Sequence, residues 1–279
     1  MVVLSDEELI ALVKEDCPYG DLTTEGLGIT NERAHIAYMS RKQSLVVACS
    51  EEAARLCELF GVSVQACSIS GTLIPPATSF FHAEGPASVI LALSKTLQNL
   101  FDYCCGVATY THHLLQTARS VNPKIVVATT RKSIPMTKKI AIKSIKAGGA
   151  IPHRLGLSES ILIFREHRLF LNDEAAAIAS LKACYPEHKV VIEADSPEEA
   201  IRFARMGADV IQLEKFPLPL LQQTVRTLKS IPPKPTLIAT GGITLANIAD
   251  YAASGVDLIV TSAPYTAPSA DVKVIINKE

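Results

Sequence analysis

The chain has 279 residues, of which 48% are hydrophobic and 20% are charged, and its formal net charge at pH 7 is −1. This composition is typical of a soluble globular protein and argues against a disordered chain, a transmembrane chain or a basic nucleic-acid-binding protein. Charged residues are frequent in the first sixteen positions, which argues against a signal peptide, so we expect a cytoplasmic protein.

The first hundred residues predict a mixed α+β domain. Helices are expected over 5–16 and 50–61, where capping residues precede amphipathic patterns, and strand-like segments are expected over 33–50 and 76–94. The apolar segment 272–276 at the other end of the chain also reads as a strand and is expected to rejoin this domain.

A long helix, expected over 94–120 with Gly106 inside it, leads into a region of different pattern. From about residue 124 onward, short β-branched runs alternate with helix patterns. The helix over 195–209 has clear ends, because Ser196 can cap it and Gly207 can terminate it. About six strand–helix units in series favour an open or incomplete α/β barrel, with a doubly wound sheet as the alternative.

This organisation predicts two domains. Residues 1–107, together with about 265–279, are expected to form the α+β domain, and residues 108–264 are expected to form the barrel. No internal repeat appears beyond the strand–helix alternation.

Polar residues follow several of the predicted barrel strands at their carboxyl ends, where the loops of a barrel converge. They are Arg131 and Lys132, His153 and Arg154, Glu193, Glu214 and Lys215, and the pair Gly241 and Gly242. Cations and glycine N–H groups suit phosphates and carboxylates, and carboxylates suit Mg²⁺. The set therefore predicts a site for a polyanion bound with Mg²⁺, of which a pyrophosphate is the natural example.

Each of these features also has a simpler interpretation. Arg131 and Lys132 fit an exposed turn, His153 fits a hydrogen-bonded structural histidine, and the two glycines fit an ordinary strand-to-helix turn. Glu193 is harder to explain in this way, because a carboxylate at the end of an apolar strand is costly unless it meets a cation.

Several collinear segments resemble the type II phosphoribosyltransferases of the quinolinate phosphoribosyltransferase family. They are TRKS (130–133), AGGAIPHRLGL (147–157), VVIEADSPEEA (190–200), DVIQLEKF (209–216) and ATGGITLANIADYAASGVDLIV (239–260), with EDCPYGDLTT near the start. Within the family, PYGDLTT and TSAPY look most like the ModD branch of pyrophosphorylases, which is associated with molybdate transport.

The resemblance implies an α+β domain joined to an open barrel, and a homodimer or higher oligomer whose active site borrows residues from the partner subunit. It implies attack by a heteroaromatic nitrogen on C1 of phosphoribosyl pyrophosphate, with Mg²⁺ as cofactor. The implied catalytic residues are Lys132, Glu193 and Glu214, of which the two glutamates also lie near the metal.

The other implied site residues contact substrates. Arg131, His153 and Arg154 match the basic cluster around the acid substrate, and Thr240, Gly241 and Gly242 match the phosphate-binding turn.

Departures from the family pattern concern the same sites. Phe164 stands where the family has a lysine that faces quinolinate, and Lys95 stands where it has an arginine from the partner subunit. Lys215 replaces an asparagine, Glu214 an aspartate, and Ser262 a glycine near the second phosphate contact.

These departures predict a phosphoribosyltransferase whose acceptor is not quinolinate, with a link to molybdate metabolism. Loss of a cation disfavours a dicarboxylic acid, whereas the Phe164 ring favours a flatter or less charged acceptor. The alternatives are a true quinolinate phosphoribosyltransferase, and a non-catalytic protein that binds a phosphorylated ligand or an oxyanion.

Overall fold

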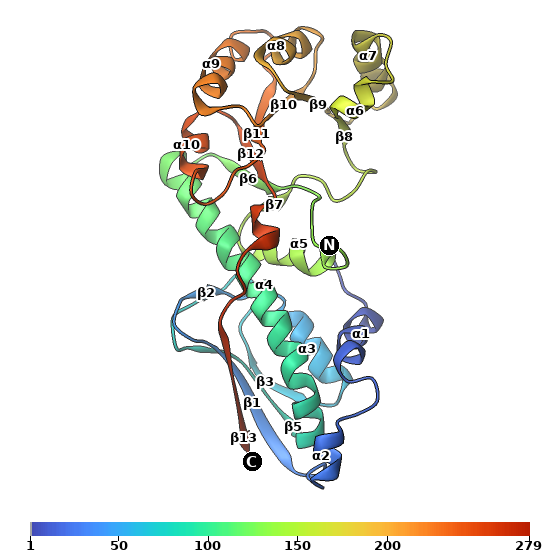
Figure 1. Ribbon diagram of the computed structural model, residues 1–279, viewed down its shortest axis with the longest axis vertical. Coiled ribbons are helices and arrows are strands. Elements are labelled where there is room, and N and C mark those ends of the chain that lie inside the picture. The colour runs from blue at the N-terminus through green and yellow to red at the C-terminus, as the bar shows by residue number, and fades with distance from the viewer. Residues whose placement is uncertain (1) are drawn as a thin grey trace. The chain divides into compact units, whose positions relative to one another are not determined.

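Seven parallel strands form one sheet in the second half of the chain (Figure 1), as seen in a computed structural model that describes residues 2–279. In spatial order the strands are β7 (Ile151–Pro152), β6 (Val126–Thr129), β12 (Leu258–Thr261), β11 (Thr236–Thr240), β10 (Val210–Glu214), β9 (Val190–Ala194) and β8 (Ile161–Ile163). Strands β8 to β12 are adjacent in chain order without a reversal, and β6 follows β12. This is the order of a barrel that is open between β7 and β8, so the predicted incomplete α/β barrel is confirmed and the doubly wound alternative is wrong.

The concave side of this sheet has its own apolar layer. One residue from each of six strands contributes to it: Ala128, Leu162, Val191, Val210, Ile238 and Val260. Residues that alternate with these point to the other face, where Ile192, Ile211 and Ile259 are equally buried. Burial on both faces explains why the strands read as continuous β-branched runs.

Helices follow the strands and cover the outer face of the sheet (Figure 1). They are α6 (Arg165–Arg168), α7 (Glu174–Cys184), α8 (Pro197–Arg205), α9 (Leu218–Leu228) and α10 (Ile248–Ala253). The Ser196 hydroxyl accepts the Glu199 N–H, which confirms the cap expected for α8.

The first part of the chain forms an antiparallel sheet in the order β13 (Val272–Lys278), β1 (Arg33–Ser40), β5 (Ser79–Pro86) and β3 (Ser63–Cys67). The C-terminal strand β13 pairs with β1 along its length, as expected from the sequence. Tyr38, Phe81 and Phe101 pack together, with ring centroids 5.1 to 6.0 Å apart. The remaining elements of this part are α1 (Asp6–Asp16), α2 (Leu22–Gly26), β2 (Leu45–Val46), α3 (Ser50–Leu59), β4 (Leu73–Ile74), α5 (Lys138–Ala147) and a 3₁₀ turn at Ala263–Thr266.

The long helix α4 (Ala87–Val121) begins seven residues earlier than the sequence predicted. The apolar residues Ile90, Leu93 and Leu97 recur at helical spacing and are buried, so the end of the expected strand segment 76–94 is helical instead. Gly106 lies on the face of α4 where Pro268 and Ala270 cross, and a Cβ at position 106 would overlap the Pro268 carbonyl oxygen. A glycine is therefore required at this crossing.

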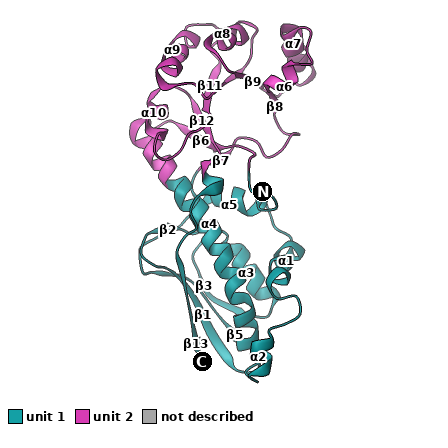
Figure 2. Cartoon of the chain, viewed as in Figure 1, with its two compact units in different colours: residues 1–112, 133–149, 264–279 teal, residues 113–132, 150–263 magenta. Residues whose placement is uncertain are grey.

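Two units, coloured in Figure 2, divide the described chain. The first comprises residues up to 112, 133–149 and 264–279, and the second comprises 113–132 and 150–263. The domain boundaries expected from the sequence, 107/108 and 264/265, stay a prediction. Among residues 2–279, no helix combines the length and apolar character needed to cross a membrane.

Candidate active site

A cavity of about 290 Å³ opens at the carboxyl ends of the strands in the second unit. The cavity adjoins the apolar layer on the side of the carboxyl ends of the strands. Side chains two residues apart in a strand point to the same face, so residues two positions after those of the layer line the cavity. Thus Phe164 follows Leu162, Glu193 follows Val191, and Thr240 follows Ile238 on the concave side. The residues that line the cavity are Thr130, Arg131, Lys132, His153, Arg154, Leu162, Phe164, Glu166, Glu193, Gln212, Glu214, Thr240 and Val260.

A larger hollow of about 550 Å³ lies on the sheet of the first unit. Its lining is mostly apolar or amide side chains, and its His35 Nδ1 lies 3.4 Å from the Glu84 carboxylate. The cavity of the second unit is smaller but gathers cations and carboxylates from several strand ends, so it is the candidate active site.

The basic wall of the cavity consists of residues that follow β6 and β7. Arg131 and Lys132 come directly after β6, and the His153 N–H donates to the Thr129 carbonyl at 2.9 Å, which places His153 and Arg154 beside them. This hydrogen bond therefore brings His153 and the cations Arg131, Lys132 and Arg154 into one wall.

Arg154 is the most constrained of these cations, since only 7% of the residue is exposed. Its Nη2 donates to the Ser160 carbonyl at 3.2 Å, but its Nε and Nη1 are buried without a hydrogen-bond partner. Burial, and then the charge of Arg131, lowers the pKa of Arg154. Buried donors that lack an acceptor are costly, so the arrangement indicates a place for an anionic ligand group.

His153 lies in the same wall. Burial, and then the charge of Arg154, lowers the pKa of its imidazole. The ring is therefore neutral near pH 7 and can donate one hydrogen bond and accept another.

The acidic wall consists of Glu193 on β9 and Glu214 on β10. Gln212, which lies opposite Glu193 in the paired strands, donates from Nε2 to the Glu193 carboxylate at 2.8 Å. Burial, and then the charge of Glu214, raises the pKa of Glu193, against the hydrogen bond from Gln212. Two carboxylates that repel one another favour a cation between them.

Gly241 allows the acidic wall to come close to the turn after β11. A Cβ at position 241 would lie 2.8 Å from the Glu214 Oε1 and 2.5 Å from the Lys215 Cγ, and its φ is +91°. The Lys215 N–H donates to the Thr240 carbonyl at 2.8 Å, and its Nζ lies 3.9 Å from the Glu214 carboxylate. A side chain at 241 would therefore displace Glu214.

The acidic wall also bears on the expected metal. Within residues 2–279, no three His, Cys, Asp or Glu side chains are grouped as metal ligands. A two-carboxylate set fits Mg²⁺ bound together with substrate phosphates, since Mg²⁺ keeps much of its coordination for water and phosphate oxygens. Glu193 and Glu214 are the residues that could hold it.

Phe164 forms the remaining wall, at the end of the edge strand β8. Its ring packs against the apolar layer and stacks on His167, with centroids 5.8 Å apart and an interplanar angle of 21°. The Phe164 N–H donates to the His167 Nδ1 at 2.9 Å, which holds the His167 ring against the turn. The cavity therefore has an aromatic face at the position where the family resemblance implies a lost cation.

Eight of the thirteen residues predicted for the site line the cavity, namely Arg131, Lys132, His153, Arg154, Phe164, Glu193, Glu214 and Thr240. Lys215 and Gly241 contact Glu214, Gly242 continues the same turn, and Ser262 follows β12. Lys95 belongs to the first unit and lies on α4. Its Nζ donates to the side-chain oxygen of Gln98 at 2.8 Å. Their roles toward substrates stay predictions.

Sequence reasoning missed Thr130, Glu166 and Gln212. A signal was available for Gln212, because it is a polar residue inside an apolar strand and lies two positions before Glu214. Glu166 belongs to a helix of four residues, whose start the sequence did not indicate.

Comparison with known proteins agrees with this geometry. Residues 107–275 match the family model of the quinolinate phosphoribosyl transferase C-terminal domain, and residues 21–105 match that of the N-terminal domain. A proposed pyrophosphorylase, ModD, of Rhodobacter capsulatus is 40% identical over 253 residues, which cover 89% of this chain and 96% of the relative. Its counterpart in Pasteurella multocida is 36% identical over 282 residues, with all of both chains covered.

A solved structure shows the same fold. The nicotinate-nucleotide pyrophosphorylase from Ehrlichia chaffeensis superposes with a TM-score of 0.91 at 21% identity, over 99% of this chain and 100% of the other.

Proposed function

Because this chain belongs to the quinolinate phosphoribosyl transferase family and is a phosphoribosyltransferase, we propose that its acceptor is a planar nitrogen heterocycle other than quinolinate. The donor is phosphoribosyl pyrophosphate, bound with Mg²⁺. The observation that carries the proposal is the Phe164 ring in the wall of a cavity that Arg154, with its unmatched donors, also lines. The family therefore gives the reaction class, and these two side chains give the acceptor class.

The charges around the cavity support an acceptor with fewer acidic groups than quinolinate. Three permanent cations, Arg131, Lys132 and Arg154, face three carboxylates, Glu166, Glu193 and Glu214. A dicarboxylic acid would add two negative charges with no further cation in the cavity, and each missing charge-assisted contact costs about 1.5 to 3 kcal/mol. An acid with one carboxylate can satisfy Arg154 and place its ring against Phe164.

The reaction follows from the two opposite walls. The acceptor nitrogen attacks C1 of the ribose, the C1–O bond breaks, and pyrophosphate leaves with the electron pair. Positive charge develops on the sugar ring, next to Glu193 and Glu214, where a preorganised negative site stabilises it. Glu193 and Glu214 would hold Mg²⁺, which would supply positive charge against the pyrophosphate leaving group.

Gln212 and Gly241 hold this acidic wall in place. Gln212 orients the Glu193 carboxylate through its hydrogen bond, and Gly241 leaves room for Glu214. We propose phosphate contacts from Thr240, Gly241, Gly242 and Ser262 at the turns after β11 and β12.

A homodimer is part of the same proposal, with each cavity completed by Lys95 of the other subunit. A lysine cannot offer a carboxylate the two-pronged contact of an arginine, which again favours a less acidic acceptor. The similarity to ModD proteins supports a link to molybdate metabolism.

The test is pyrophosphate release from phosphoribosyl pyrophosphate and Mg²⁺ with a panel of nitrogen heterocycles that includes quinolinate and nicotinate. We expect release with at least one compound at a rate well above that with quinolinate. Fastest release with quinolinate would instead make the protein a true quinolinate phosphoribosyltransferase. Tight calorimetric binding of the donor without any release would make it a non-catalytic binder.

A further inference from the structure

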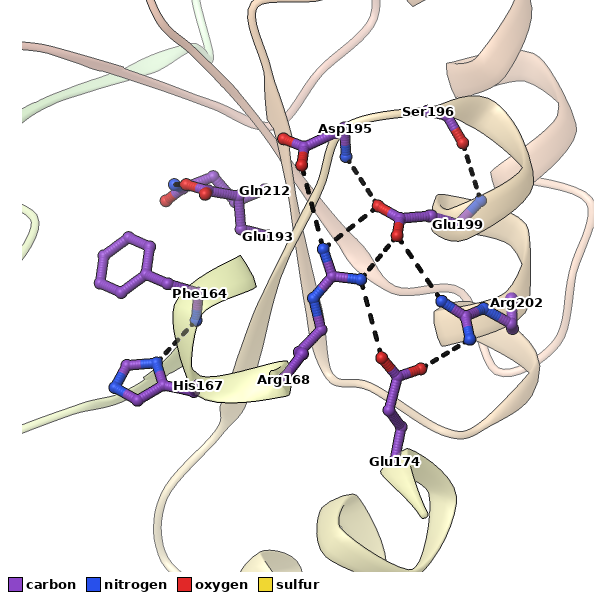
Figure 3. Close-up of polar contacts among 10 residues, drawn as sticks. All are labelled: Phe164, His167, Arg168, Glu174, Glu193, Asp195, Ser196, Glu199, Arg202 and Gln212. Atoms are coloured by element: carbon purple, nitrogen blue, oxygen red, sulfur yellow. Dashed lines mark hydrogen bonds and ion pairs between the residues drawn. The ribbon is translucent and has the colours of Figure 1, made fainter. Parts of the chain in front are cut away.

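An ion cluster centred on the buried Arg168 side chain lies behind the Phe164 wall (Figure 3). It joins Arg168 at the end of α6 to Glu174 at the start of α7 and to Asp195, Glu199 and Arg202 around α8. None of these residues lines the cavity, so the proposed reaction does not use them directly.

The turn that carries Phe164 has few supports of its own. Strand β8 is an edge strand of three residues, and α6 has four. A helix this short is not stable by itself. The residues after it cannot anchor it by burial, because Leu169 is 74% exposed and Phe170 is 86% exposed.

Arg168 connects this turn to α7 and α8. Its side chain is only 8% exposed, and its guanidinium makes a two-pronged contact to Glu199, at 2.6 Å from Nη1 and 3.3 Å from Nη2. The guanidinium also lies 5.1 Å from the centre of the Phe203 ring on α8. The side chains of Phe164 and Arg168 leave opposite sides of the α6 turn (Figure 3), so one faces the cavity and the other faces the cluster.

The same carboxylate that binds Arg168 also holds the neighbouring strand end. Glu199 Oε2 accepts the N–H of Asp195 at 3.1 Å, two residues after Glu193. The ladder between β8 and β9 pairs Ile163 with Ile192, so its register places Phe164 next to Glu193. One anchor therefore fixes both the aromatic wall and the end of the acidic wall.

We propose that Arg168 is a positioning residue, which acts through Glu199 to fix the turn that presents Phe164 to the acceptor beside Glu193. The inference rests on the proposed function for the meaning of the Phe164 wall. The contacts through which Arg168 and Glu199 hold the turn do not depend on any substrate.

The chain contains no tryptophan, so Phe164→Trp introduces a single fluorophore into the wall. In this background, acrylamide quenching and the emission maximum are measured for Arg168→Met and Arg168→Lys. The matched control is Arg202→Met, which removes an arginine from the same cluster, 4.9 Å from the same Phe203 ring, but from α8 and not from α6.

We expect Arg168→Met to raise the quenching constant at least twofold with a red-shifted emission, and Arg168→Lys to give an intermediate value because it keeps the charge without the two-pronged contact. Arg202→Met should leave both signals unchanged. Circular dichroism establishes that each variant is folded, and if Arg168→Met does not fold, Arg168→Lys decides.

Unchanged fluorescence in the folded Arg168 variants would overturn the proposal, and so would an equal change in Arg202→Met, which would indicate general loosening of the cluster. Because no substrate is present, this result is independent of the panel that tests the proposed function.

Discussion

Two arginines of the second unit have little exposed surface but opposite surroundings: the Arg154 residue is 7% exposed, and the Arg168 side chain is 8% exposed. Arg154 lines the cavity, and its Nε and Nη1 have no hydrogen-bond partner. At Arg168 the Nε also lacks a partner, but the two Nη atoms lie 2.6 to 3.9 Å from three carboxylates. Burial has the largest single effect on the pKa of both arginines, and by itself it would lower both pKa values. At Arg168 the Glu199 hydrogen bond and the charges of the carboxylates outweigh burial and raise the pKa, whereas at Arg154 the charge of Arg131 lowers it further.

The difference separates a binding residue from a structural one. A buried guanidinium without an anion destabilises the fold, and the ligand that supplies the anion recovers that free energy as affinity. A guanidinium whose charge is already matched by carboxylates gains little from a further anion. The two arginines should therefore respond to mutation in opposite ways.

The largest effect is expected for Arg168→Met on stability. Removing the buried arginine that contacts Glu199 and Asp195 leaves the more distant Arg202 as the other cation of the cluster, so the free energy of unfolding should fall by about 3 kcal/mol in urea titrations. Arg202→Met, whose side chain is 45% exposed, should lower it by less than about 1 kcal/mol. Equal losses in the two variants would show that Arg168 has no special place in the cluster.

Arg154→Met should do the reverse, weakening ligand binding while leaving stability unchanged or higher. We expect its affinity for the best-bound acid of the panel to fall about 30-fold, or about 2 kcal/mol, in calorimetric titrations. Arg226→Met on the exposed face of α9 removes the same charge and serves as the control. A loss of stability with unchanged affinity would assign Arg154 a structural role.

A smaller effect is expected from acid. Although burial raises the pKa of Glu199, the hydrogen bond from Arg168 and the N–H of Asp195 leave it below the usual 4.5. The pair therefore stabilises the fold above pH 4.5, and this contribution is lost as the pH falls through the lowered pKa. The stability difference between the wild type and Arg168→Met should therefore shrink as the pH falls below 4.5, and a constant difference would contradict the assignment.

The smallest effect is expected at His153. In Arg154→Met, the pKa of His153 should rise only part of the way toward its usual 6.5, because burial, the larger cause of its lowered pKa, remains. Titration of the imidazole signals by NMR measures this change. An unaltered pKa would mean that the two side chains are not in electrostatic contact.

The sequence predicts the barrel and most of the site because both depend on local patterns. Continuous β-branched runs follow from burial on both faces, and strand ends bring residues as distant as Arg131 and Glu214 together in any barrel of this order. Motifs around His153 and Glu193 then add the family resemblance.

The sequence does not predict which hydrogen-bond and ion-pair partners each side chain has. The contrast between Arg154 and Arg168 depends on which carboxylates lie within reach. Those of Arg168 come from two segments of the chain, with Glu174 on α7 and Asp195 and Glu199 around the start of α8. The start of α4 was misplaced for a similar reason, since apolar residues after Pro86 fit a strand or a helix until their burial is known.

Quinolinate binding to the wild type and to Phe164→Lys is the most direct test of whether the aromatic wall excludes quinolinate. A lysine at position 164 restores one charge-assisted contact, so calorimetry should show affinity at least 10-fold higher in the variant, in line with about 1.5 to 3 kcal/mol for such a contact. Equal affinity of the two proteins would contradict the assignment of Phe164 as the residue that selects the acceptor.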